Sequence, residues 1–189
     1  MQHATVTLLT EADYLAGEPY SAIRHEFVDG HVYAMAGASK AHNTIALNIA
    51  TRLHAHLRGS PCRAYVADMR VYVEKASAYY YPDVVVSCAG PDTAADAPSH
   101  YLTAPVLIAE ILSESTETID RREKMRAYAQ IDSLREYLLV DSRSAQAELY
   151  RKAPEGGWEQ WIAAPGETLQ LDSIGLALVV DDLYENVKF

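Results

Sequence analysis

The sequence predicts an α/β domain in which a mixed β-sheet is flanked by helices. Two short apolar runs, residues 83–87 and 106–112, are rich in Val, Ile and Leu, which is typical of central strands covered on both faces. Between residues 39 and 141 the order of predicted elements is helix, three strands, helix, strand. That order indicates helices packed on one mixed sheet.

The amino-terminal elements each have a recognisable pattern. Thr10 is a good N-cap for a short helix that ends at Gly17. The Asp29-Gly30 pair stands between two β-prone runs, so we expect a hairpin over residues 24–35. Apolar residues then recur every four positions between 39 and 58, which predicts a long amphipathic helix; they are Ile45, Ile49, Leu53 and Leu57.

The later elements follow from shorter patterns. Residues 63–66, 69–74 and 136–140 are β-prone runs, and a polar loop of about 16 residues separates the two central strands. Residues 113–118 are rich in N-cap residues, with Ser113 and Ser115 as candidate caps, so a second helix is expected over 120–131. A β-meander with a Gly-rich turn is expected at the carboxyl-terminal end, with strands over 145–151, 158–162 and 176–180.

The composition is that of an ordinary globular chain. Of 189 residues, 49% are hydrophobic and 22% are charged, which argues against disorder. We assign residues 1–189 to a single domain because no Gly/Ser-rich or Pro-rich stretch marks a linker. No apolar run reaches the roughly 18 residues of a membrane span. Residues 1–10 lack a basic segment followed by an apolar one, so we expect no secretory signal, no membrane and a cytoplasmic protein.

The charge of the chain is uneven. It carries 16 Lys and Arg against 26 Asp and Glu, a formal charge of −10, which argues against coating nucleic acid through bulk positive charge. However, residues 40–75 carry +4 and residues 121–126 carry +3, whereas residues 76–120 hold seven acids and no Lys or Arg. We interpret this as an acidic body with basic helices on either side of an acidic segment.

Several other residues have no expected role in chemistry. Cys62 and Cys88 lie 26 residues apart without a CxxC pair, and we interpret both as reduced structural thiols. His54 and His56 are two apart on a helix and cannot share a metal ion, so zinc is not expected. The tyrosines at 79–81 could stack on bases, but packing between strands is the favoured interpretation.

The most informative residue is Glu110, because it interrupts a strand that is otherwise apolar on both faces. An unpaired buried carboxylate would cost several kcal/mol or shift its pKa, so a metal ion or another cation must compensate it. The alternative is a structural ion pair with an arginine. Asp83 follows Pro82 at the start of the other central strand, where a turn residue is also common. If these strands are neighbours, Asp83 and Glu110 form an oxygen-rich site for Mg²⁺ or Mn²⁺.

Lys124 is a candidate partner for these carboxylates. It lies four residues after Asp120 and four before Tyr128, so the three share one helix face. In one interpretation Asp120 and Lys124 form a surface ion pair. In the other, the lysine points at the carboxylates and stabilises charge on a phosphate or orients water.

Taken together, these segments resemble a known family over nearly the whole chain. The segments are Arg24–Gly30, His42 on its helix, Tyr81–Val86, Glu110–Ser113 with Ser115 and Thr116, the set Asp120, Lys124 and Tyr128, and Arg135–Tyr137. The sequence resembles the Uma2 (Uma-two) family, described as "putative restriction endonuclease", within the PD-(D/E)XK nuclease superfamily. The restriction endonuclease-like core of that superfamily has the same order of helix, three strands, helix, strand.

The resemblance implies a metal-dependent DNA endonuclease that hydrolyses phosphodiester bonds with Mg²⁺ or Mn²⁺. Asp83 and Glu110 would be the metal carboxylates. The superfamily lysine is expected two residues after the glutamate, where this chain has Leu112, so Lys124 would supply the ammonium from the next helix. Glu26 matches the family's upstream acid and would complete the metal shell or hold Lys124.

The resemblance also suggests how a DNA substrate would be held. His42 would contact a phosphate, with a structural role as the equal alternative, and Arg121 and Arg122 are further candidate substrate contacts. A homodimer is expected because cutting both strands calls for two sites, and the carboxyl-terminal meander could supply its interface. The alternative function is a catalytically inactive nuclease-fold protein that serves as a nucleic-acid-binding or assembly module.

Overall fold

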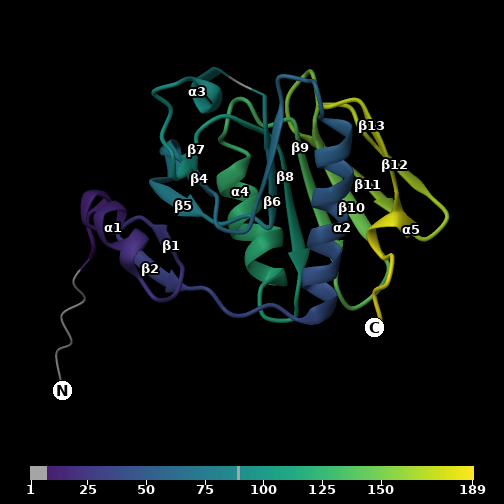
Figure 1. Ribbon diagram of the computed structural model, residues 1–189, viewed down its shortest axis with the longest axis horizontal. Helices are drawn as coiled ribbons and strands as arrows, with labels where there is room; N and C mark the ends of the chain where they lie inside the picture. Colours follow the sequence, from purple (N-terminus) through teal and green to yellow (C-terminus); the bar gives the residue numbers. More distant parts are fainter. Residues whose placement is uncertain (1–7, 89) are drawn as a thin grey trace.

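The computed structural model describes residues 8–88 and 90–189, which form two main β-sheets with helices between and around them (Figure 1). The six-stranded sheet has the order β11-β10-β9-β8-β6-β3. Its strands are β3 (Arg63–Val66), β6 (Val84–Ser87), β8 (Pro105–Leu112), β9 (Glu136–Asp141), β10 (Ala147–Lys152) and β11 (Trp158–Ala163). β8 and β9 are parallel and the other neighbours are antiparallel, so the sheet is mixed, as predicted.

The second sheet corrects the expectation of one mixed sheet. It has the order β2-β1-β5-β4-β7, with β1 (His25–Val28), β2 (His31–Ala34), β4 (Arg70–Val73), β5 (Ala78–Tyr80) and β7 (Tyr101–Leu102). The predicted hairpin is therefore part of a larger sheet. The predicted strand over 69–74 also belongs here, because the chain turns after β3 at Ala67, whose φ is +48°.

The first two helices agree with their sequence patterns. α1 (Glu11–Gly17) has Thr10 as its N-cap, and the Thr10 side chain accepts a hydrogen bond from the Asp13 amide. α2 (Lys40–His56) is capped in the same way by Ser39. Ile45, Ile49 and Leu53 of α2 are buried, as the four-residue spacing predicts.

The helix between β8 and β9 differs from its prediction. It contains the π-helix η3 (Ile119–Lys124), followed by α4 (Met125–Tyr128). No side chain caps η3 at Thr118, so the predicted capping role of Ser113 and Ser115 is wrong. Their hydroxyls instead bond to each other, and Ser113 also bonds to Thr116. π-helical turns are rare and occur often at functional sites, and this one carries Asp120 and Lys124.

The carboxyl-terminal strands are only partly a meander. β10 and β11 extend the six-stranded sheet, whereas β12 (Thr168–Leu171) and β13 (Leu176–Val179) form a separate two-stranded sheet. The sequence prediction missed β12. The short remaining elements are η1 (Glu18–Tyr20), η2 (Glu74–Ala76), α3 (Gly90–Thr93) and α5 (Val180–Leu183), of which α3 and β7 lie in the loop between β6 and β8.

The central strands β6, β8 and β9 of the six-stranded sheet are buried on both faces, which explains their apolar sequences. On one face, Val84, Val86 and Ala109 pack in a core that includes the apolar residues of α2. On the other face, Val85 and Ile108 pack in a second core, with α4 and the second sheet. Glu110 alternates with Ala109 along β8 and is therefore on the face of Ile108, towards α4.

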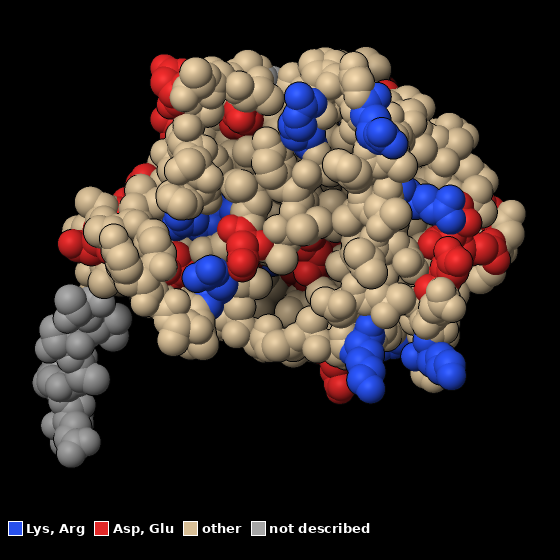
Figure 2. All heavy atoms as spheres, in the orientation of Figure 1, with Lys and Arg blue, Asp and Glu red and all other residues tan. Residues whose placement is uncertain are grey.

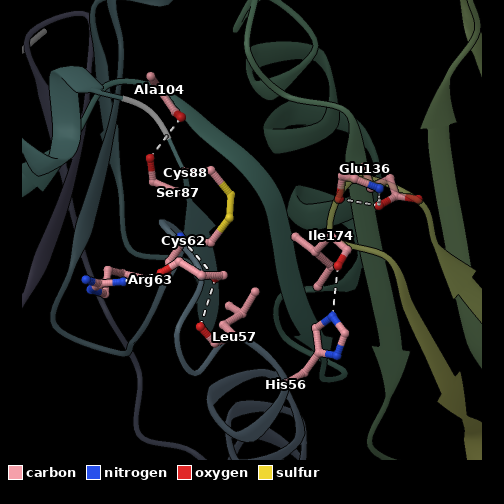
Figure 3. The surroundings of a disulfide bond; sticks show 11 residues. His56, Leu57, Cys62, Arg63, Ser87, Cys88, Ala104, Glu136 and Ile174 are labelled. Atoms are coloured by element: carbon pink, nitrogen blue, oxygen red, sulfur yellow. Dashed lines mark hydrogen bonds between the residues drawn. A yellow bond between two sulfur atoms is a disulfide. The ribbon is translucent and has the colours of Figure 1, made fainter.

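The cysteines form a disulfide, which corrects the expectation of reduced thiols. Cys62 and Cys88 are bonded to each other (Figure 3). Antiparallel pairing of β3 with β6 puts Arg63 opposite Ser87, so the cysteines that flank these residues also meet. The sequence separation of 26 residues gave no sign of this pairing. Disulfides persist mainly in oxidising environments, so the cytoplasmic location stays a prediction that the cysteines do not support.

Two further predictions concern membranes and the start of the chain. Among residues 8–88 and 90–189, no helix is long and apolar enough to cross a membrane. The expectation about a signal in residues 1–10 lies mostly outside the described residues, which begin at Leu8.

Candidate carboxylate–lysine site

Side chains from both sheets and three helices meet where β6 begins. Asp83 precedes β6, Glu110 lies in β8 and Glu26 lies in β1 of the second sheet. η3 contributes Asp120 and Lys124, while Tyr128 comes from α4 and His42 from α2. We call Glu26, Asp83, Glu110, Asp120 and Lys124 the carboxylate–lysine site. Four of these five residues were candidate site residues from sequence alone.

Glu110 lies at the centre of this site and is only 3% exposed. Its Oε1 accepts hydrogen bonds from Lys124 Nζ at 3.1 Å and from the Tyr128 hydroxyl at 3.0 Å. Burial raises the pKa of Glu110 well above its usual value, and Asp120, Asp83 and Glu26 add to this, against the opposing charge of Lys124. The predicted compensating cation is therefore present, but it is a lysine and not an arginine.

Asp83 is next to Glu110, as expected for the ends of neighbouring strands. β6 and β8 pair with Val84 opposite Ala109, and the Asp83 amide donates to Glu110 Oε2 at 3.4 Å. Asp83 Oδ2 accepts a hydrogen bond from the Ile111 amide at 2.8 Å. These backbone contacts fix the Asp83 carboxylate beside the end of β8.

His42 contacts Asp83 from the first turns of α2. Its Nε2 lies 3.2 Å from Asp83 Oδ2. Burial lowers the pKa of His42, but the hydrogen bond and charge of Asp83 outweigh burial, and the net shift is upward. The predicted contact of His42 with a phosphate is untested; in this structure His42 interacts with a carboxylate.

Lys124 is buried, which excludes the interpretation as a surface ion pair. Its ammonium lies 3.0 Å from Glu26 Oε1, 3.1 Å from Glu110 Oε1 and 3.3 Å from Asp120 Oδ1. Although burial alone would lower the pKa of Lys124, the charges of Glu110, Glu26 and Asp120 raise it well above its usual value. Lys124 is thus a charged hub that holds three carboxylates together. Glu26 was predicted either to complete a metal shell or to hold Lys124, and the structure shows its contact with Lys124.

Asp120 is the site residue that the sequence analysis did not assign. It is 2% exposed, and among the described residues its Oδ1 has no hydrogen-bond partner. In the sequence, Asp120 is marked by its four-residue spacing from Lys124, and we considered it only as the partner of Lys124 in a surface ion pair. Tyr128 was noticed for the same spacing, and its hydroxyl donates to Glu110.

The site contains more negative than positive charge. Three of the four carboxylates, those of Glu26, Glu110 and Asp120, surround the single lysine, and the fourth, Asp83, pairs with His42 at the edge. A hard divalent cation prefers carboxylate oxygens and would relieve this excess, and Asp120 Oδ1, which lies 3.3 Å from Lys124 Nζ but accepts no hydrogen bond among the described residues, is a further oxygen of the kind it takes. No group of three or more His, Cys, Asp and Glu among the described residues is arranged to hold a metal ion by itself. The donor set therefore fits Mg²⁺ or Mn²⁺ bound by one or two carboxylates, with other ligands from water or substrate.

The two arginines predicted to bind substrate differ from each other. Arg121 pairs with Glu117 at 2.9 Å and with Glu148 at 2.6 Å, so contact with a substrate would require it to leave these carboxylates. Arg122 is exposed, and the described residues include no ion-pair partner for it. Substrate binding by either residue stays a prediction.

The predicted basic helices are less basic in the folded protein than in the sequence. Arg52 pairs with Asp182 at 3.0 Å, Lys75 pairs with Asp132 at 2.9 Å, and Arg70 is buried. On the face in Figure 2, Lys and Arg are scattered and do not form a continuous stripe. Local carboxylates thus neutralise much of the positive charge that we expected to flank the site.

Two other surface features lie outside the site. Tyr79, Tyr80 and Tyr81 are each at most 5% exposed, which confirms packing as their main role. A mainly apolar groove lies between α2 and β3, and no site carboxylate lines it. Its lining residues are Ala50, Thr51, His54, Ala55, Arg58, Ala64 and Val66.

The fold and the site define a mixed α/β protein with a buried, acid-rich site at the ends of two central strands. The sequence profile of the Uma2 family, described as "Putative restriction endonuclease", matches residues 12–181. The chain belongs to this family.

Similar proteins cover nearly the whole chain. An uncharacterized protein of Synechocystis sp., slr1290, is 36% identical over 181 residues, covering 96% of this chain and 94% of that protein. A second one from the same organism, sll1609, is 35% identical and covers 89% and 94%. The crystal structure of a "putative nuclease belonging to DUF820" from Anabaena variabilis superposes with a TM-score of 0.77. It covers 94% of this chain and 98% of that chain at 17% identity, so this similarity concerns the fold.

Proposed function

We propose that this protein is a metal-dependent DNA endonuclease that hydrolyses phosphodiester bonds with Mg²⁺ or Mn²⁺. The observation that carries the proposal is the cluster of four carboxylates at the start of β6, three of which contact one buried lysine. A protein gains no stability from gathering like charges, whereas a metal site needs them. Membership of the Uma2 family supports the same reaction class.

Asp83 and Glu110 are the proposed metal ligands. The Ile111 amide and the Asp83 amide, respectively, hold these two carboxylates in place. A bound Mg²⁺ or Mn²⁺ would polarise the phosphodiester and lower the pKa of its water. Tyr128 and Lys124 both donate to Glu110 Oε1 and leave Oε2 as the less engaged oxygen.

Lys124 acts in this proposal by holding Glu26, Glu110 and Asp120. An ammonium has three donors, and three carboxylates surround this one. Stabilisation of a phosphate by Lys124, as the resemblance implies, therefore requires the release of one carboxylate. His42 is placed to hold Asp83, and its raised pKa favours the charged imidazolium beside that carboxylate.

Cleavage of supercoiled plasmid and of oligonucleotides with Mg²⁺ or Mn²⁺ tests the proposal. We expect Asp83→Asn and Glu110→Gln each to lower the rate by about 100-fold or more, because metal assistance is worth several kcal/mol. The control is Glu123→Gln, an exposed acid on the same helix as Lys124, which should cleave like the wild type. Equal cleavage by Asp83→Asn and wild type would remove Asp83 from the chemistry.

The alternative function is a nucleic-acid-binding or assembly module without turnover. Leu112, at the position of the superfamily lysine, is buried, and Lys124 is fully engaged by carboxylates. Titration calorimetry separates the two functions. The absence of Mg²⁺ and Mn²⁺ binding, together with DNA binding that survives Glu110→Gln, would favour the binding module.

A further inference from the structure

The outer edge of the second sheet is unusually exposed. β2 is the edge strand, and all ten residues from 31 to 40 are exposed. Val32 is 45% exposed and Tyr33 is 55% exposed. Figure 1 shows the β1–β2 hairpin at one end of the molecule, away from the carboxyl-terminal strands.

The backbone of β2 offers free hydrogen-bonding groups along this edge. The Met35 amide donates to the Arg24 carbonyl at 2.8 Å, and inward and outward amides alternate along an antiparallel strand. The amides of Val32 and Ala34 therefore point outward, and they make no hydrogen bond within the described residues. An exposed edge with unpaired backbone groups is a template for pairing with another strand.

Apolar side chains surround the same edge. Leu9 donates its amide to the Gly30 carbonyl beside the hairpin turn, and Ile23 precedes Arg24, the partner of Met35. We call this exposed surface the hairpin patch. Its members, each 39–55% exposed, are Leu8, Leu9, Ile23, Val32, Tyr33 and Met35. Exposed apolar side chains beside unpaired backbone are typical of a protein interface.

The lack of charged residues along the strand edge limits the kinds of partner that the hairpin patch can bind. Residues 30–39 contain no Asp, Glu, Lys or Arg, so this surface does not suit a nucleic-acid backbone or an anionic membrane. Two copies of this chain, each at −10, repel each other at most other surfaces. An uncharged, self-complementary strand edge avoids that repulsion.

We propose that the hairpin patch is a homodimer interface in which β2 pairs antiparallel with β2 of a second copy. Pairing centred on Tyr33 puts Val32 of each copy opposite Ala34 of the other, and their outward amides and carbonyls exchange four backbone hydrogen bonds. Such an isologous contact closes on itself and joins the two five-stranded sheets into one.

This arrangement relates the two carboxylate–lysine sites. Glu26 is the direct partner of Tyr33 in the β1–β2 register, so their side chains are on the same face of the sheet. A two-fold axis perpendicular to the sheet keeps that face on the same side in both copies. The two sites then lie on the same side of the joined sheet, whether or not the protein cleaves DNA.

The hairpin patch is a better interface than the carboxyl-terminal strands. β11 is the edge strand of the six-stranded sheet and exposes Ile162 at 57%. However, β11 also carries Glu159, and the Arg151 guanidinium covers Trp161 at 4.7 Å from its ring centroid. A charged residue on an edge strand opposes strand pairing.

Sedimentation equilibrium and light scattering over a range of concentrations test this interface. We expect wild type to reach twice the 20.9 kDa mass of the chain. Val32→Lys and Ala34→Pro should each weaken the dimer by about 100-fold or more, as for residues central to an interface. Ala34→Pro removes an outward amide and leaves the β1 ladder intact. Ile162→Lys on β11 is the matched control and should remain dimeric.

Amide hydrogen exchange on the wild type gives a second test that needs no variant. Exchange at Val32 and Ala34 should slow as the protein concentration rises, whereas exchange in β11 should not change. A monomer at all concentrations, a dimer unaffected by both β2 variants, or a dimer broken by Ile162→Lys would each overturn the proposal. Circular dichroism shows whether each variant keeps the wild-type fold. If a variant is unfolded, the hydrogen-exchange measurement on the wild type decides the test in its place.

Discussion

One short helix, η3, contributes to two charge clusters that differ in burial and in how their charges are paired. Lys124 of η3 lies among Glu26, Glu110 and Asp120, and Asp83 adjoins Glu110, so a cluster of four carboxylates contains one lysine. Three residues earlier, Arg121 begins a second cluster, which we call the arginine network. It consists of Arg121 and Arg143 with Glu117, Asp141 and Glu148.

The two clusters differ in the hydrogen bonding and the solvent exposure of their charged side chains. In the arginine network, Arg121 binds Glu148 through two parallel hydrogen bonds of 2.8 and 2.6 Å, and Arg143 is 44% exposed to water. In the carboxylate–lysine site no member side chain is more than 23% exposed, and one buried oxygen of Asp120 has no hydrogen bond within the described residues. The difference suggests that the arginine network stabilises the fold, whereas the site keeps uncompensated charge for a ligand.

The largest expected effect on stability comes from removing the lysine. Lys124→Met would leave three buried or half-buried carboxylates, Glu26, Glu110 and Asp120, without their cation, and breaking a buried pair in this way costs about 3–5 kcal/mol. We expect that loss in the free energy of unfolding, measured by urea denaturation at pH 8 without divalent metal. Lys124→Arg is the control, because it keeps the charge, and it should lose less. A loss below about 1 kcal/mol for Lys124→Met would contradict the role of Lys124 as the hub.

Replacing a carboxylate by its amide should lower the free energy of unfolding in the arginine network but not in the carboxylate–lysine site. Glu148→Gln removes a charged hydrogen-bond partner of Arg121 and should cost about 1.5–3 kcal/mol. Glu110→Gln removes one of four like charges and should leave the free energy of unfolding unchanged or increase it at pH 8. Both residues are less than 10% exposed, so burial does not explain a difference. A similar loss for both variants would show that the two clusters are equally structural.

The sequence predicted much of the fold because local patterns decide it. The capping residues Thr10 and Ser39, the Asp29-Gly30 turn and the apolar spacing of α2 each specify their element without help from distant residues. The division into two sheets was not predictable, because it depends on a turn at Ala67 that has no Gly, Asn or Asp to mark it. The Cys62–Cys88 disulfide depends on the register of β3 against β6, which is equally non-local.

The site was predictable for a different reason. Glu110 is conspicuous because a carboxylate in an apolar strand demands a partner, whereas the spacing of Lys124 also fitted a surface pair, and its place in the site was indicated by the family resemblance. The burial of Asp120 was not visible, since its spacing also fits an exposed ion pair. The neutralisation of Arg121 by Glu148 was hidden as well, because it joins η3 to β10 across 27 residues.

Divalent metal should stabilise the protein through the site and not through the arginine network. With Mg²⁺ or Mn²⁺ at about ten times its dissociation constant, binding to the folded state alone adds about 1.4 kcal/mol. We expect a rise in Tm of wild type and of Glu148→Gln under these conditions, and none for Asp83→Asn. An equal rise in Asp83→Asn would place the metal elsewhere. This measurement does not depend on cleavage, so it tests the metal site even in an inactive protein.

The smallest expected effect is on the pH dependence of the free energy of unfolding. Glu110 and Glu148 change this free energy in opposite directions as pH rises, because their pKa values are shifted in opposite directions. Burial raises the pKa of Glu110 above its unfolded value of about 4.3, so its contribution is fully favourable below that value and is lost as pH rises through the folded pKa. The hydrogen bonds from Arg121 lower the pKa of Glu148, so its contribution is present above the unfolded pKa and is lost as pH falls through the folded pKa.

The two contributions therefore occupy separate pH windows and can be tested separately by urea denaturation at a series of pH values. Glu110→Gln should flatten the curve above about pH 4.3, and Glu148→Gln should flatten it below that pH. Glu123→Gln, at an exposed position, should leave both limbs as in the wild type. If Glu110→Gln changed only the acid limb, Glu110 would be a stabilised carboxylate like Glu148, and the contrast between the two clusters would fail.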